Sequence, residues 1–325
     1  MKNAIELIEI LRAQGVELYL AGDSVRFRGA NGALTPEMKD RMKEHRSEII
    51  AHLRQEIVRT GQGGLVVRRG DGDFTQIYRP CRISEMAGND EARWIITNAF
   101  GQKRVPHSFL FHGLSGTGKT TMARIIEMGL NCKQGPTSEP CCECFCCRRI
   151  IARKGSMAVI ELNSVERVKD DFKKTLKNFD AYGCGAVFDG GRSSILLIDE
   201  CHGLTKDQAQ LFLKYVEDVS EDNYYIFCTT EPEKFLPALR DRCAINIEFK
   251  QVPAWELMNL LINICYLEQL KPNEDVLRRI IEHSEGKPRV AVRELQQRYY
   301  AGDLEKITSP ETTTTLLISE RSPME

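Results

Sequence analysis

The segment from Gly113 to Thr120, GLSGTGKT, constrains the chain more than any other feature of its sequence. A short apolar run at residues 108–111 precedes it, and Met122, Ile125 and Ile126 follow at helical spacing. The segment therefore has the P-loop pattern between a strand and a helix, the context in which such a loop binds phosphate. Glycines let its backbone N–H groups surround phosphate oxygens without interference from side chains. The alternative is a glycine-rich turn that binds nothing.

This pattern predicts a site for ATP and Mg²⁺. Lys119 is expected to bridge the β- and γ-phosphates, and Thr120 is expected to ligate magnesium. The residues predicted to contact the nucleotide and its metal ion are Gly113, Ser115, Gly116, Thr117, Gly118, Lys119, Thr120, Thr121 and Asp199.

A second run supplies the acidic half of this site. Residues 194–198, SILLI, are continuously apolar, as expected for a buried central strand, and Asp199 and Glu200 follow directly. Ligands of α/β folds bind at the carboxyl ends of the strands. Asp199 is therefore predicted to hold hydrated magnesium, and Glu200 to polarise the attacking water. Either acid alone could be a solvated strand end.

Composition and pattern divide the chain into segments. The 325 residues are 42% hydrophobic and 28% charged, which is ordinary for a globular protein, and the net charge of -1 says little about nucleic acid. No apolar stretch is long enough to span a bilayer, so we expect a cytoplasmic protein without membrane contact. The predicted segments are a small α+β module (1–59), a glycine-rich linker (60–77), an α/β core with a parallel sheet (78–250), a helical lid (251–301) and a disordered tail (302–325).

Four cysteines are predicted to bind zinc. Cys132, Cys141, Cys144 and Cys147 have the spacing C-x8-C-x2-C-x2-C, which suits a closed tetrahedral structural site. The segment 132–147 has too little apolar content to fold without a metal ion. Cys142 and Cys146 are additional thiols that leave the ligand set slightly ambiguous. The alternative is a reduced cluster without metal.

The N-terminal segment has the pattern helix, hairpin, helix. Val16, Leu18 and Leu20 alternate with polar residues, and Thr35 followed by Pro36 is a strong helix start. With the text LRAQGVELYLAGDSVRFRGANGALTPEM, residues 1–55 resemble the TubC-type N-terminal docking domain. That resemblance implies a module for protein–protein contact with an unknown partner. A helical cap packed on the core is the alternative.

The larger part of the chain resembles another family. The texts YRPCRISEMAGND, RVPHSFLFHGLSGTGKTTMARIIEMGLNC, PCCECFCCRRI, LLIDECHGL and CTTEPEKFLPALRDRC are similar to the DNA polymerase III gamma/tau family. The match runs from about residue 78 to residue 293 and preserves the order, spacing and context of the motifs. It implies an AAA+ P-loop ATPase fold with an inserted zinc module and a helical lid.

The resemblance also implies roles for residues outside the P-loop. Thr229 matches sensor 1, Arg242 matches the arginine that reaches the neighbouring subunit's ATP, and Arg289 matches the sensor 2 arginine of the lid. With Glu200 and Lys119 these residues complete the expected catalytic set. Residues 78–80 would border the adenine.

Several positions depart from the family's pattern. Asp241 replaces the serine before Arg242, Lys287 and Pro288 replace small or apolar residues, and residues 163–166 differ from a DNA-proximal segment. Direct DNA contact is therefore left open. The chain ends soon after the expected lid, so we expect the family's helical collar to be missing.

These patterns together predict a clamp-loader-like ATPase that acts in DNA replication or repair. Its expected partners are copies of itself or related AAA+ subunits, a sliding clamp and primed DNA. A loader for a helicase or another machine would use the same motor. A nucleotide-switched adaptor working through the N-terminal module is the alternative from another class.

Overall fold

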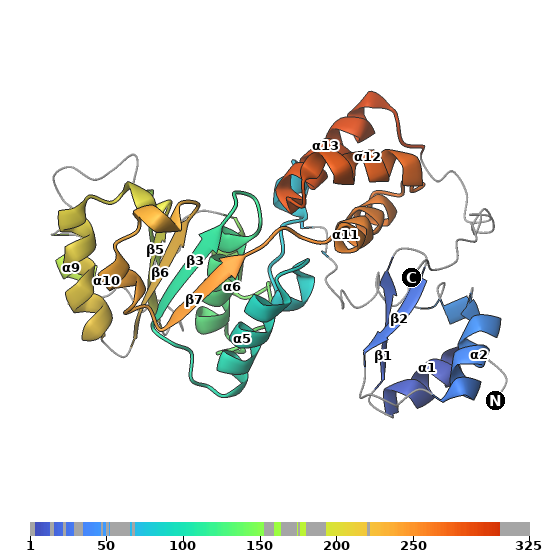
Figure 1. Ribbon diagram of the computed structural model, residues 1–325, viewed down its shortest axis with the longest axis horizontal. Helices are drawn as coiled ribbons and strands as arrows, with labels where there is room; N and C mark the ends of the chain where they lie inside the picture. Colours follow the sequence, from blue (N-terminus) through green and yellow to red (C-terminus); the bar gives the residue numbers. More distant parts are fainter. Residues whose placement is uncertain are drawn as a thin grey trace.

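The computed structural model shows a small N-terminal module, a parallel sheet covered by helices, and a helical lid (Figure 1). It describes residues 4–13, 16–21, 24–28, 35–46, 48–49, 52, 66, 69–152, 159–163, 174, 176–179, 193–219 and 222–305. The expected hairpin turn at 22–23, the segment 164–166 and the tail from 306 onward lie outside the described residues. Among the described helices, none has both the length and the apolar character that a membrane crossing requires.

A five-stranded parallel sheet forms the centre of the α/β core, as predicted. Its strands lie in the order β4-β5-β6-β3-β7, so the first strand of the core lies between the last two. The strands are β3 (Ser108–Gly113), β4 (Val159–Asn163), β5 (Ser194–Asp199), β6 (Asn223–Thr229) and β7 (Ile245–Phe249). This order places the carboxyl ends of β3, β5 and β6 at one edge, where open α/β sheets bind ligands.

Alternating side chains of the strands build two hydrophobic cores. Phe109 and Phe111 of β3 belong to the core that contains helices α5 and α6, whereas Leu110 belongs to the core that contains α9 and α10. Successive strand residues point to opposite faces, so the central strands β3, β5 and β6 contribute to both cores. Figure 1 shows the helices on the two sides of the sheet. They are α5 (Asp90–Gly101), α6 (Lys119–Asn131), α9 (Lys206–Glu217) and α10 (Pro237–Arg240).

The lid has its own hydrophobic core. Its helices are α11 (Ala254–Leu267), α12 (Glu274–Ser284) and α13 (Pro288–Ala301). The short helix α4 (Phe74–Ile77), within the segment predicted as a linker, packs here: the Phe74 ring lies 5.4 Å from Tyr78 and 5.7 Å from Tyr299, centre to centre. Beyond the predicted end of the lid at residue 301, Leu304 is buried in the same core. The hydrophobic core of the lid therefore includes residues that precede its three helices in the sequence and a residue that follows them.

The N-terminal module has the predicted helix–hairpin–helix order. It contains α1 (Ala4–Ala13), the antiparallel strands β1 (Glu17–Ala21) and β2 (Ser24–Arg28), and α2 (Pro36–Glu44). The Thr35 hydroxyl accepts a hydrogen bond from the Met38 N–H, with Pro36 in the first turn, as the sequence predicts. Ile8, Leu11 and Ile49 contribute to a separate hydrophobic core.

Helix α6 allows a direct test of core packing. A Cβ at Gly129 would lie 2.2 Å from the Thr137 carbonyl oxygen and 2.9 Å from Phe100, whereas a Cβ at Gly101 would meet nothing within 4 Å. We expect Gly129→Ala to lower the free energy of unfolding by about 1–3 kcal/mol through overpacking. Gly101→Ala should be neutral or slightly stabilising, because alanine is the better helix former. Thermal unfolding of both variants checks this, and equal melting temperatures would contradict it.

Candidate functional site

The P-loop leaves β3 at a point where only glycine fits. Gly113 has a φ of 125°, and a Cβ there would lie 2.2 Å from the Phe249 carbonyl oxygen at the end of β7. Gly116 and Gly118 also have positive φ values, of 82° and 113°. These conformations are costly for other residues but accessible to glycine. The loop therefore turns back over the sheet edge and leads directly into α6.

Lys119 lies folded over this loop. Its Nζ atom donates hydrogen bonds to the carbonyl oxygens of Gly113, at 2.7 Å, and Leu114, at 2.8 Å. The side chain is buried, and burial is the largest cause that lowers the pKa of Lys119 from its usual value. A buried ammonium group gains most from an anionic ligand, which favours its charged form.

The two predicted magnesium ligands lie next to each other. The Thr120 hydroxyl donates to Asp199 Oδ2 at 3.2 Å, from the first turn of α6 to the end of β5. Glu200 follows with a left-handed backbone, φ 50°, and its N–H donates to Asp199 Oδ1 at 3.1 Å. Hydroxyl and carboxylate oxygens are the ligands that magnesium prefers. This donor set, beside the glycine loop, fits a nucleotide with its magnesium ion.

A cavity of about 430 Å³ brings most of the predicted nucleotide residues together. Ser115 through Thr121 line one side, and Asp199 and Glu200 line the sheet edge. Arg289, from the first turn of α13, lines it from the lid. Residues 78–80 also line it, and Arg79 Nε donates to Thr121 Oγ1 at 3.2 Å. Gly113 shapes the loop from outside the cavity lining.

Thr229 lies near this cavity but outside its lining. It is fully buried at the end of β6, and its hydroxyl accepts a hydrogen bond from the Glu231 N–H at 3.0 Å. The next residue, Thr230, contacts the carboxylate of Glu200: its hydroxyl donates to Glu200 Oε2 at 3.1 Å. His202 Nδ1 lies 3.1 Å from Thr229 Oγ1. Sequence reasoning missed both Thr230 and His202, although both lie within the quoted motif texts.

Arg242 lies away from the cavity. It follows α10, pairs with Glu217 at the end of α9, and donates to the Ala238 carbonyl oxygen at 3.0 Å. Its side chain is 39% exposed. Asp241 caps the end of α10 beside it. Arg242 therefore lies at the surface, in an ion pair with Glu217 and outside the cavity lining.

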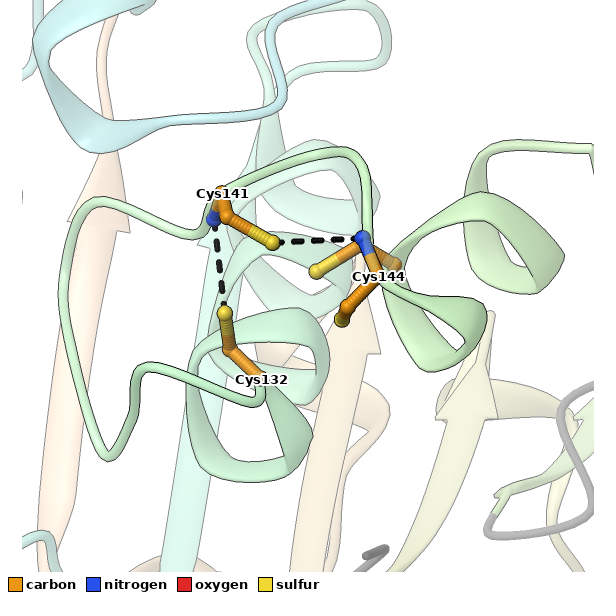
Figure 2. A group of neighbouring side chains, drawn as sticks. Cys132, Cys141 and Cys144 are labelled. Carbon is orange, nitrogen blue, oxygen red and sulfur yellow. Dashed lines mark hydrogen bonds between the residues drawn. The ribbon is translucent and has the colours of Figure 1, made fainter. Parts of the chain in front are cut away.

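The four predicted cysteines form a compact cluster. The sulfur atoms of Cys132, Cys141, Cys144 and Cys147 all lie within 4.8 Å of one another. The Cys132 sulfur accepts a hydrogen bond from the Cys141 N–H at 3.4 Å, and the Cys141 sulfur accepts one from the Cys144 N–H at 3.3 Å. Figure 2 shows both hydrogen bonds. Cys142 and Cys146 are not part of this group. Four convergent thiols that receive backbone N–H groups are compatible with a zinc ion.

A buried carboxylate connects the cysteine module to the nucleotide cavity. Glu85 is fully buried, lines the cavity, and accepts hydrogen bonds from Arg69, from Arg82 at 3.5 Å, and from the Cys81 N–H at 2.9 Å. Arg82 also donates to the carbonyl oxygen of Pro140 at 3.0 Å, next to the cysteine cluster. Sequence reasoning did not identify this network: Cys81 and Arg82 lie within four residues of Glu85, but no local pattern indicates the contacts with Arg69 and Pro140.

The fold and the cavity define the class of protein: an AAA+ P-loop ATPase fold. The Thermotoga maritima RuvB Holliday junction branch migration motor superimposes with a TM-score of 0.50 at 20% identity, over 71% of this chain and 69% of that one.

The family follows from the sequence comparisons. A family model described as DNA polymerase III, delta subunit, matches residues 88–253, just over half of the chain. The chain therefore belongs to the DNA polymerase III delta subunit family. The DNA polymerase III subunit gamma/tau of Mycobacterium bovis is 33% identical over 68% of this chain, and the tau subunit of Bacillus subtilis is 30% identical over 71%. These alignments cover 37% and 40% of the relatives, so the chain spans less than half of their length.

The N-terminal resemblance is also confirmed. A family model described as the TubC N-terminal docking domain matches residues 5–55.

The Glu85 network leads to a stability prediction. Glu85→Ala would leave Arg69, whose side chain is 12% exposed, without its carboxylate, and breaking a buried pair costs about 3–5 kcal/mol. The matched control is Glu274→Ala, which removes an exposed ion pair with Arg278 and should cost at most about 1 kcal/mol. Urea unfolding followed by the fluorescence of Trp94 and Trp255, in α5 and α11, measures both. Equal losses would contradict the importance of the buried pair.

Proposed function

We propose that the chain is a cytoplasmic ATP-hydrolysing subunit of a clamp-loader-like assembly that acts in DNA replication or repair. One observation carries the proposal: the P-loop, the Thr120–Asp199 pair, Glu200 and Arg289 meet at a single cavity. A protein that only binds nucleotide needs an acid such as Asp199 for magnesium, but it does not need a second acid such as Glu200 beside it. The family relationship supports DNA replication as the setting.

The residues divide the work of hydrolysis. Backbone N–H groups of the P-loop and Lys119 bind the phosphates, and Thr120 and Asp199 hold magnesium. Magnesium, when bound, neutralises charge that develops on the phosphate oxygens. Glu200 orients and polarises the attacking water, and Arg289 from the lid stabilises the transferred phosphoryl group. Thr229 acts as sensor 1 through the network at the end of β6.

Arg242 would complete the site of a neighbouring AAA+ subunit. Its exposure and its position outside its own cavity support this role. The assembly would act on a sliding clamp and primed DNA, and the N-terminal module would bind a docking partner.

The proposed role of Arg242 predicts ATP hydrolysis that depends on assembly. Wild-type specific activity should rise with protein concentration and with primed DNA, whereas Arg242→Ala should stay flat and reach a rate lower by about tenfold or more, because an arginine in trans contributes strongly to phosphoryl transfer. Arg278→Ala, which removes an exposed arginine on the lid, is the matched control and should behave as wild type.

Other outcomes favour the alternatives. If wild type and Arg242→Ala hydrolyse ATP equally slowly at every protein concentration, with and without primed DNA, the hypothesis of a self-assembling motor is contradicted. A nucleotide-switched adaptor, or a subunit that needs another partner, would then explain the chain better. Stimulation by DNA but not by a sliding clamp would favour a loader for a helicase or another machine.

We also propose that the cysteine cluster binds one structural zinc ion. The expected zinc content of the purified protein, by elemental analysis, is one ion per chain. Cys144→Ser should lose the ion and lower the melting temperature, because the module lacks an apolar core of its own. Cys146→Ser, outside the cluster, is the matched control and should keep the ion. A purified wild type without zinc, with a melting temperature that added zinc does not change, would refute the site.

A further inference from the structure

His202 lies between the ends of two strands and contacts three residues there. Its Nδ1 atom is 3.1 Å from Thr229 Oγ1, at the end of β6, and 3.4 Å from Glu200 Oε2, just after β5. Its Nε2 atom is 3.3 Å from Glu231 Oε1, in the loop that follows β6. Only 18% of the His202 side chain is exposed. The imidazole therefore connects the proposed hydrolytic acid to the neighbouring strand.

The chemistry of these contacts fixes part of the arrangement. A carboxylate only accepts hydrogen bonds, so Nε2 can donate to Glu231 only when Nε2 carries a proton. The Thr229 hydroxyl already accepts the Glu231 N–H, which leaves its own proton available to Nδ1 of a neutral ring. When both ring nitrogens are protonated, Nδ1 donates toward Thr229 and Glu200 instead. Nδ1 can donate to Glu200 Oε2 only when it carries a proton; with a bare Nδ1 the ring is anchored by Thr229 and packs beside that oxygen without a hydrogen bond to it.

Glu200 has an unusual backbone conformation, and its carboxylate is contacted from more than one side. It follows the last residue of β5 with a left-handed φ of 50°, which is uncommon for a residue with a side chain. The same carboxylate oxygen, Oε2, accepts the Thr230 hydroxyl at 3.1 Å. Two residues from different strand ends therefore converge on one oxygen of this acid.

We propose that His202 is a positioning residue for hydrolysis: anchored by Thr229 and Glu231, it holds the Glu200 carboxylate in the orientation that polarises water. Thr230 provides the second contact to the same oxygen. This inference rests on the proposed function, because it gives Glu200 the role of the hydrolytic acid. A general base works only when it is held in a productive geometry, and a misplacement of about 1 Å can cost about 100-fold in rate.

The test compares His202→Ala and His202→Asn in the full-length protein, under the conditions of concentration and DNA that give the highest wild-type rate. We expect His202→Ala to lower kcat about 10- to 100-fold while the affinity for a fluorescent ADP analogue stays within about twofold. His202→Asn should recover part of the loss, because its amide can occupy the position of Nδ1. Thr230→Val, which removes the second contact, should lower kcat in the same way.

Two controls separate the positioning of Glu200 by His202 from a general effect of removing a histidine that pairs with a carboxylate. His283 also pairs with a carboxylate, Glu294 Oε1 at 3.3 Å, but lies on the lid helix α12, so His283→Ala should leave kcat unchanged. In a Glu200→Gln background the acid is already gone, so adding His202→Ala should change the residual rate by less than about twofold.

The outcomes are distinct. A kcat of His202→Ala equal to that of wild type overturns the positioning role and leaves the proposed function intact. A parallel fall of kcat, nucleotide affinity and melting temperature, without recovery in His202→Asn, also overturns it, since that pattern belongs to a structural residue. A wild type that hydrolyses no ATP under any of the conditions overturns the proposed function and the positioning role together.

Discussion

The close approach of β3 and β7 at Gly113 is the constraint on which the rest of the site depends. No Cβ fits between Gly113 and the backbone of Phe249, so the two strands end in contact. The P-loop begins on one side of this contact, and the chain leading to the lid begins on the other. The Lys250 N–H donates to Asn89 Oδ1 at 2.8 Å, and the Val252 N–H donates to the Gly286 carbonyl oxygen at 2.8 Å. One glycine thus brings the phosphate loop and the base of the lid together.

The sequence allowed prediction of features that are local or that repeat with a regular period. The P-loop, the acids after β5 and the four cysteines are short patterns whose spacing alone indicates their chemistry. The parallel sheet followed from apolar runs alternating with helical patterns, and the structure confirms it. The contact between Thr120 and Asp199 could be expected because the P-loop that leads to Thr120 follows one parallel strand and Asp199 ends another, and the carboxyl ends of both strands lie at the same edge.

Other contacts depend on strand order and side-chain direction, which no local pattern encodes. The role of Thr229 as sensor 1 stays a prediction, and the contact of the next residue, Thr230, with Glu200 was missed because successive residues at a strand end point in different directions. The pairing of Arg69 with Glu85 depends on how the glycine-rich segment folds back over the core. That segment lacks periodicity in sequence, and its few buried side chains were therefore missed.

Helix α6 has a chemical site at each of its ends. It begins at Lys119, in the phosphate loop, and ends at Asn131, directly before the first cysteine of the cluster. Its 13 residues span about 20 Å of continuous hydrogen-bonded backbone. The proposed nucleotide and zinc sites are therefore joined by one helix. If nucleotide raised the affinity for zinc, zinc would have to raise the affinity for nucleotide by the same factor, without any contact between the two ligands.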